Sequence, residues 1–192
     1  MQTQKVIFSE LGVDGISPYQ RGDWHKIAVH TPDEIRGFFG PYRFLSNAER
    51  CDVWYEGLKY PSSENAYQAA KFPSHERGAF QQCSPIEAIR LSATLPIADV
   101  VQWAERRVDV MRAVLMSKFE HNVELREKLL ATGDAYLEER LWWRDTFWGF
   151  DVNLNQGENR LGQLLMEIRR DLRAQRSANQ GELGHLTLPA HW

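Results

Sequence analysis

One long helical segment constrains the fold of this chain more than any other feature of its sequence. From Asp99 to about Glu120, apolar side chains recur at helical spacing in two neighbouring stripes. The first stripe consists of Trp103, Val110 and Val114, and the second of Val108, Met111, Leu115 and Phe119. A helix that is apolar over so wide an arc has to be covered on several sides. The sequence therefore predicts that this helix lies at the centre of the core.

The rest of the chain is predicted to form one α+β domain around that helix, mostly helical and with a small β-hairpin or sheet. The chain has 192 residues, of which 43% are hydrophobic, and this suits one domain with a full core. Residues 1–34 show little sustained periodicity and are predicted to be a loosely structured arm. Residues 35–173 are predicted to form the domain, and the polar residues 174–192 a disordered tail.

Local signals divide the domain into elements. A Glu-Gly step at residues 56–57 separates two short strand-like pieces, which predicts a hairpin. Further helices are predicted from Ser62 or Ser63 to the residue before Pro73, from Ser84 to before Pro96, and over residues 122–132. Gly133 suits the left-handed residue that ends the third of these. A last helix is predicted to run from about residue 159 to 173.

The helix that follows Pro61 carries the best candidate for chemistry. Glu64, Gln68 and Lys71 stand at positions i, i+4 and i+7, so all three side chains share one face. A solvated face with a Glu/Lys pattern is the alternative interpretation of these three residues.

A second candidate is the segment from Trp142 to Gly149, where four large aromatic residues flank Asp145 in a predicted loop. Aromatic rings at the edge of a pocket stack on bases, whereas a lone Trp is more often part of a core. Asp145 is interpreted as a group that orients a sugar hydroxyl or acts as a second acid.

A third candidate is the start of the last helix, Gly157 to Gly162, where Asn159 is interpreted as a capping residue. Free backbone N–H groups at such a start can bind a phosphate, although an ordinary tight turn has the same pattern. The formal net charge is −3, which argues against a broad contact with nucleic acid and restricts any contact to a local one. Two arginine clusters, at residues 106, 107 and 112 and at residues 169, 170 and 173, are interpreted as solvated helix faces.

Several classes of protein are excluded by composition. Two cysteines without a CxxC motif and six scattered histidines predict neither a disulfide framework nor a metal site, and no cofactor is expected. The chain has no apolar run of about 20 residues that could span a membrane, and no membrane partner is expected. A cytoplasmic protein with metal-independent chemistry is predicted.

Six motifs, in this order, are similar to those of NADAR-domain proteins of the YbiA type. They are residues 40–47, residues 55–72, Trp103, Lys118-Phe119, residues 145–149 and residues 157–166. The resemblance covers about residues 37–173 and implies a YbiA-like fold and an N-glycosidase that cleaves a ribosyl–nitrogen bond. Two substrate classes belong to that family: ADP-ribose on guanine bases of nucleic acid, and phosphoribosylated intermediates of riboflavin synthesis.

The segment from Phe39 to Asn47 is more similar to members that remove ADP-ribose from guanine, and this substrate is therefore favoured. A cognate ADP-ribosyltransferase toxin is then an expected partner, whereas the riboflavin reading needs only a small ribosylated heterocycle. Ala48 replaces the usual Phe, and residues 91–98 replace a basic stretch that would contact phosphate. A non-catalytic module that binds ADP-ribose is a further alternative, against which Glu64 and Lys71 argue.

The chemistry and the resemblance together define an expected site. Glu64 is expected to move protons, Lys71 to form an imine or to stabilise an anionic partner, and Asp145 with Asn47 to position the ribose. The other residues expected to bind substrate are Arg43, Phe44, Ser46, Tyr67, Gln68, Trp103, Trp148, Gly149 and Asn159.

Overall fold

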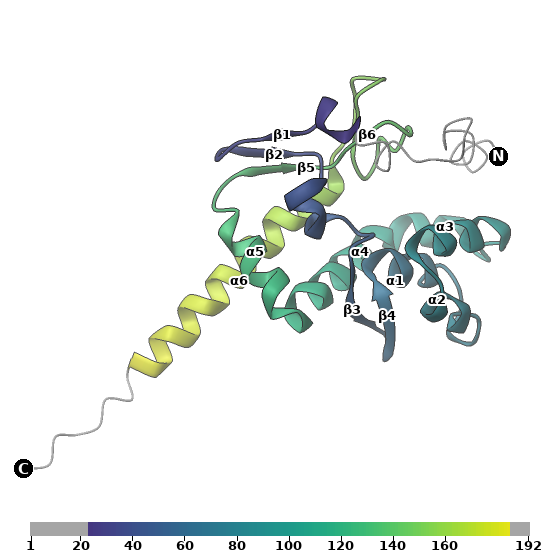
Figure 1. Ribbon diagram of the computed structural model, residues 1–192. Helices are drawn as coiled ribbons and strands as arrows, with labels where there is room; N and C mark the ends of the chain where they lie inside the picture. The colour runs from purple at the N-terminus through teal and green to yellow at the C-terminus, as the bar shows by residue number, and fades with distance from the viewer. Residues whose placement is uncertain (1–22, 185–192) are drawn as a thin grey trace, which may run out of the picture.

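The computed structural model describes residues 23–184, which form one α+β assembly of helices with three small sheets (Figure 1). The strands are β1 (Val29–His30), β2 (Glu34–Arg36), β3 (Arg50–Tyr55), β4 (Leu58–Ser62), β5 (Tyr136–Glu138), β6 (Arg140–Leu141) and β7 (Phe150–Asp151). The α-helices are α1 (Ser63–Ala69), α2 (Gly78–Gln82), α3 (Pro85–Thr94), α4 (Val100–His121), α5 (Val123–Ala131) and α6 (Arg160–Gly184). Short 3-10 helices are η1 (Asp23–Lys26), η2 (Gly40–Leu45) and η3 (Ser74–Glu76). The predicted fold class is confirmed.

Helix α4 lies at the centre of the core, as its two apolar stripes predict. It packs on strand β3 and on helices α1, α5 and α6 (Figure 1). Val114, Leu115 and Phe119 are fully buried, and Val110 and Met111 are nearly so. Because one helix contacts so many neighbours, it joins the hairpin, α1 and α6 in a single hydrophobic cluster.

The predicted hairpin is present as the antiparallel pair β3 and β4. Its turn consists of Glu56 and Gly57, which both have positive φ, 46° and 77°. Two successive left-handed residues match the right-handed twist of the flanking strands, which is why short hairpins favour such turns. The last residue of β4, Ser62, then caps α1, so the hairpin leads directly into the helix that carries Glu64.

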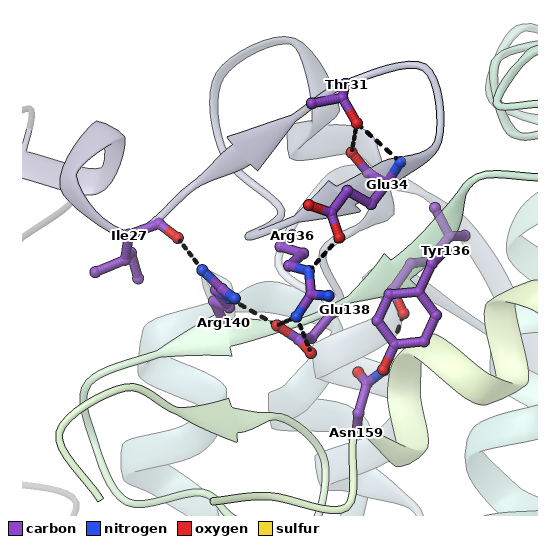
Figure 2. Close-up of polar contacts among 9 residues, drawn as sticks. Ile27, Thr31, Glu34, Arg36, Tyr136, Glu138, Arg140 and Asn159 are labelled. Carbon is purple, nitrogen blue, oxygen red and sulfur yellow. Dashed lines mark hydrogen bonds and ion pairs between the residues drawn. The ribbon is translucent and has the colours of Figure 1, made fainter. Parts of the chain in front are cut away.

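A second sheet joins distant parts of the chain, because β2 pairs with β1 on one side and in parallel with β5 on the other. At its centre the buried carboxylate of Glu138 accepts hydrogen bonds from Arg36 and Arg140, and Arg140 also donates to the carbonyl of Ile27 (Figure 2). A third, two-stranded sheet pairs β6 with β7 in parallel. The short strand β5 therefore connects the start of the described chain to the segment that leads into residues 142–149, here called the aromatic loop.

The arm and the tail differ from their predicted limits. Within the predicted arm, residues 23–34 contain η1, β1 and the start of β2, because long-range pairing with β5 orders a segment that has no periodicity of its own. Residues 1–22 lie outside the described residues. Helix α6 continues to Gly184 rather than ending near residue 173, with exposed side chains from residue 174 to 178, so backbone hydrogen bonds and not burial extend it. Residues 185–192 of the predicted tail also lie outside the description.

Within residues 23–184, no helix is both long and apolar enough to cross a membrane.

Candidate active site

Helix α1 is anchored at its start by a buried network. The Ser62 hydroxyl accepts the backbone N–H of Asn65 at 3.1 Å and donates to the Asn65 carboxamide oxygen at 2.5 Å. The Asn65 amide nitrogen donates in turn to the carbonyls of Phe80 and Cys83. The backbone N–H of Glu64 donates to the carbonyl of Asn47 at 2.9 Å. These contacts hold the first turn of α1, and with it Glu64, in one place.

Glu64, Gln68 and Lys71 are connected in one hydrogen-bonded chain. The Lys71 ammonium donates to Gln68 Oε1 at 2.5 Å, and Gln68 Nε2 donates to Glu64 Oε1 at 2.7 Å. Lys71 also donates to the Ser92 hydroxyl at 3.2 Å. The helix ends at Ala69, two residues before Lys71, and the following turn still brings the ammonium group to the same face. The three predicted residues therefore meet.

Burial changes the acid–base behaviour of this chain of groups. Loss of hydration raises the pKa of Glu64 above its ordinary value, and the nearby charge of Asp145 adds to the shift, whereas Gln68 and Lys71 oppose it. Loss of hydration also lowers the pKa of Lys71, against the attraction of Glu64. Both groups are thus easier to neutralise than in water, as proton transfer and nucleophilic attack require.

Three predicted aromatic residues line the same region. The Tyr67 ring lies 5.2 Å from the Trp103 ring and 5.5 Å from the Trp148 ring, between centroids. The Lys71 ammonium lies over Tyr67 at 5.6 Å and over Trp103 at 6.0 Å. Tyr67 and Trp103 also belong to the hydrophobic core, so their rings pack in the core and at the same time lie beside the Lys71 ammonium.

Asp145 approaches this face from the loop between β6 and β7. Its Oδ1 accepts the backbone N–H groups of Phe147 at 3.2 Å and of Trp148 at 2.9 Å. Burial raises its pKa, and these two N–H groups and the charge of Arg107 act in the opposite direction. The same loop positions the ring of Phe147, which the Arg107 guanidinium covers at 3.5 Å.

The segment that includes η2 supplies the other side of the site. Asn47 is buried, and its Oδ1, which is itself buried, has no hydrogen-bond partner among the described residues. The neighbouring Ser46 is held through its carbonyl, which accepts from the Lys118 ammonium at 2.9 Å. Arg43 lines a cleft of about 500 Å³ together with Ala48, the chain neighbour of Asn47, but Glu64, Lys71 and Asp145 are not part of its lining, and Phe44 is buried in the core. The remaining lining residues of the cleft are Glu49, Arg50, Ser84, Pro85 and Ile86.

Two predicted residues, Gly149 and Asn159, have structural contacts instead. A Cβ on Gly149 would lie 2.7 Å from the carbonyl oxygen of Glu139, so only glycine fits there. The Asn159 side chain accepts the backbone N–H of Glu139 and donates to the carbonyl of Leu137. It also donates to the hydroxyl of Tyr136, beside which it lies in Figure 2. It does not cap α6.

The start of α6 is also closed to a phosphate. The backbone N–H groups of residues 158, 159, 160 and 161 donate to the carbonyls of residues 146, 149, 147 and 148, respectively. The loop that carries Asp145 therefore uses the donors that an anion would need. The two turns pack so closely that residue 157 has to be glycine, because a Cβ there would meet the carbonyl oxygen of Gly149.

Three charged residues near the site were not among the residues predicted to form it. Arg107 belongs to a cluster interpreted as a solvated face, yet its charge acts on Asp145. Lys118 is fully buried, and burial lowers its pKa to about 8. Glu139 follows β5, and burial together with Asp145 and Glu64 raises its pKa to about 8. For Lys118 the sequence did offer an indication, because a charged residue among the apolar positions of a central helix is unusual. The sequence around Glu139 offers no such indication.

Among the described residues, no three His, Cys, Asp or Glu side chains are arranged to hold a metal ion. The two cysteines, Cys51 and Cys83, are both free.

Comparison with known proteins places this geometry in context. The model of the NADAR domain matches residues 28–173. The chain is 35% identical over 145 residues to N-glycosidase YbiA of Escherichia coli (strain K12), which covers 73% of this chain and 89% of that protein. It is 30% identical to N-glycosidase Npun_R5314 of Nostoc punctiforme, with coverage of 69% and 87%.

A longer relative and a solved structure agree with this. The chain is 34% identical over 169 residues, 86% of its length, to riboflavin biosynthesis protein VVA0006 of Vibrio vulnificus (strain YJ016), of which it spans only 44%. The NMR structure of the E. coli protein YbiA superposes with a TM-score of 0.66 at 32% identity, over 80% of this chain and 92% of that one.

Proposed function

This chain belongs to the NADAR family, and from that premise we propose that it is an N-glycosidase that hydrolyses a bond between a ribose and a nitrogen atom. The observation that supports the proposal most directly is the group of three carboxyl side chains, Glu64, Glu139 and Asp145, whose charges act on one another, with the Lys71 ammonium joined to Glu64 through Gln68. Cleavage of an N-glycoside needs a proton on the leaving nitrogen, a nucleophile, and negative charge near the anomeric carbon. Carboxyl groups of different pKa can donate the proton, activate a water molecule as the nucleophile, and provide the negative charge.

Glu64 is proposed to accept a proton from the attacking water. It is held by Gln68 on one oxygen, which leaves the other oxygen for a water molecule. Asp145 and Asn47 are proposed to position the ribose, because both have oxygens that can accept sugar hydroxyls. Trp148 and Trp103 are proposed to stack on the base.

Lys71 has two proposed roles that one experiment separates. As an amine of lowered pKa it could add to the opened sugar and release the base from an imine; as an ammonium it would stabilise an anionic group. Borohydride added during turnover reduces an imine to a stable adduct, which mass spectrometry would find on Lys71. If Lys71→Ala retained full hydrolysis, the covalent role would be excluded.

For the substrate, we propose ADP-ribose attached to guanine in nucleic acid. The cleft of about 500 Å³ beside Arg43, which Arg50 also lines, supports a substrate that extends beyond one phosphoribosyl group. Such a substrate has to be made by a transferase that adds ADP-ribose to guanine, and a cognate toxin of this kind is the proposed partner.

A phosphoribosylated intermediate of riboflavin synthesis is the second candidate. It is favoured by the similarity to a protein named for riboflavin biosynthesis, which extends over more of this chain than the YbiA match does. This substrate would need neither nucleic acid nor the outer part of the cleft.

The test measures sugar release from two substrates: an oligonucleotide with ADP-ribosylated guanine, and a phosphoribosylated aminopyrimidine. Wild type is compared with Glu64→Gln, and with Glu124→Gln as a control, because Glu124 is exposed on α5. Loss of a general base predicts a fall of about 100-fold or more in kcat for Glu64→Gln and no change for the control. Release from the small substrate alone would favour the riboflavin role. Binding of ADP-ribose without release from either substrate would contradict the enzyme proposal and favour a non-catalytic module.

A further inference from the structure

Glu139 is fixed in place more firmly than its position between two short strands suggests. Its backbone N–H donates to Asn159 Oδ1 at 3.0 Å, and its carbonyl accepts the N–H of Phe150 at 2.7 Å. A Cβ on Gly149 would lie 3.4 Å from its Cγ, so the backbone of the aromatic loop passes directly beside its side chain. The Glu139 carboxyl is therefore held at the edge of the loop that carries Asp145.

The two adjacent glutamates have opposite environments. Along an extended segment successive side chains point to opposite faces. Glu138 accepts hydrogen bonds from Arg36 and Arg140 within the second sheet, as Figure 2 shows. No donor in the described part of the chain makes a hydrogen bond to the carboxyl of Glu139. Glu138 is thus paired inside the second sheet, whereas the Glu139 side chain lies against the backbone at Gly149, within range of the charges of Asp145 and Glu64.

The charges around Glu139 come from four elements. Asp145 of the aromatic loop and Glu64 of α1 disfavour its ionisation, and Arg43 of η2 and Lys118 of α4 favour it. Burial is the largest effect, and the resulting pKa of about 8 leaves Glu139 protonated at neutral pH. Asp145, by contrast, accepts two backbone N–H groups, which stabilise its anion. When two carboxyl groups in one site have such different environments, their pKa values differ, and one can act as an acid while the other stays ionised.

We propose that Glu139 is the acid that protonates the leaving nitrogen. This inference rests on the proposed N-glycosidase activity. The proton of the Glu139 carboxyl passes to the nitrogen, which keeps the electron pair of the breaking C–N bond. A water oxygen bonds to the anomeric carbon and loses a proton to Glu64. The products are the free sugar and the base with a neutral amine that carries the proton from Glu139, and transfer of the proton from Glu64 through solvent to Glu139 restores the site.

The test compares Glu139→Gln and Glu139→Asp with wild type on whichever substrate wild type hydrolyses. The expected results are a fall in kcat of about 100-fold or more for Glu139→Gln, partial activity for Glu139→Asp, and a wild-type rate that declines above pH 8 with this decline absent from Glu139→Gln. Glu138→Gln is the contrast: it should lower the melting temperature and keep the wild-type pH dependence.

Stability supplies a readout that does not depend on turnover. Glu139 binds its proton more tightly in the folded than in the unfolded chain, so it destabilises the fold increasingly as pH rises from about 4.5 to about 8. Glu139→Gln should therefore melt at the same or a higher temperature than wild type at pH 9. A wild type without activity on any ribosylated substrate would overturn the proposed function itself. An active wild type, with Glu139→Gln equal to it in rate and pH profile, would overturn only the role of Glu139.

Discussion

Lys118 illustrates at the scale of one residue how the site uses buried charge. Its ammonium is fully buried in α4 and holds the carbonyl of Ser46, the residue before Asn47. A buried ammonium is costly, and its pKa of about 8 reflects that cost. The fold accepts this cost at a position where the ammonium fixes the backbone directly before Asn47. Glu139 is a second charged group whose burial disfavours its ionised form and so lowers stability near neutral pH.

The pH dependence of stability tests this view of Lys118. Between about pH 8 and pH 10.5 the unfolded chain holds the Lys118 proton and the folded chain does not, so this residue makes stability rise with pH in that window. In Lys118→Met that contribution is missing. Urea unfolding at pH 7.5 and pH 10 should show that the variant lacks a gain on the order of 2 kcal/mol. Parallel stability profiles of the two proteins would contradict the burial of the charge.

At the scale of elements, two serine caps serve different purposes. Ser62 is fully buried at the start of α1, and both its hydrogen bonds go to Asn65. Ser84 caps α3 in an exposed capping box with Glu87. The first cap fixes the helix that carries Glu64 and leads to Lys71, whereas the second stabilises a helix that lines the cleft at its start and carries none of the residues proposed as catalytic.

Substitution by alanine should separate the two caps. Ser62→Ala should lose about 2 kcal/mol of unfolding free energy, because it leaves a buried N–H unpaired, and should also reduce kcat by moving Glu64. Ser84→Ala should lose about 1 kcal/mol and keep kcat. Chemical denaturation and steady-state rates measure both effects. Equal effects of the two substitutions on kcat would show that the first turn of α1 does not need its cap for catalysis.

The whole molecule is predicted to unfold as one unit. All buried apolar side chains of the described residues except Phe39 and Leu141 form one cluster that includes the hairpin, α1, α4, α6 and β5, so the loss of any part exposes the others. Leu115→Ala, in the centre of α4, should cost about 2–5 kcal/mol, whereas Val101→Ala on the exposed first turn should cost less than about 0.5 kcal/mol. Tryptophan fluorescence and far-UV circular dichroism should give the same midpoint for each variant. Separate midpoints would show that the sheet around β5 unfolds independently.

The features predicted correctly from the sequence are those with local causes. The Glu-Gly turn, the capping serines, Gly133 and the apolar stripes of α4 each act through neighbours within a few residues, so the pattern contains the physics that forms them. The meeting of Glu64, Gln68 and Lys71 was predictable for the same reason. Their catalytic roles stay predictions.

The features that could not be predicted depend on contacts between distant segments. The pairing of β2 with β5 joins residues about 100 positions apart, and it converts part of a predicted arm into a sheet. The closure of the α6 start by the Asp145 loop is equally non-local, and it removes the predicted phosphate site. Nothing in the sequence around Glu139 distinguishes it from Glu138.

The sequence by itself determined where most of the longer helices begin, which helix is central, and which residues of α1 share a face, because short-range hydrogen bonds and side-chain periodicity decide these. Only the tertiary structure decided which charged groups lose their water and which of them face one another. Hydration and Coulomb interactions depend on distance in space and not on distance along the chain. The contrast between Glu138, paired with arginines, and Glu139, whose pKa is raised by burial and by Asp145 and Glu64, is the clearest result of that difference.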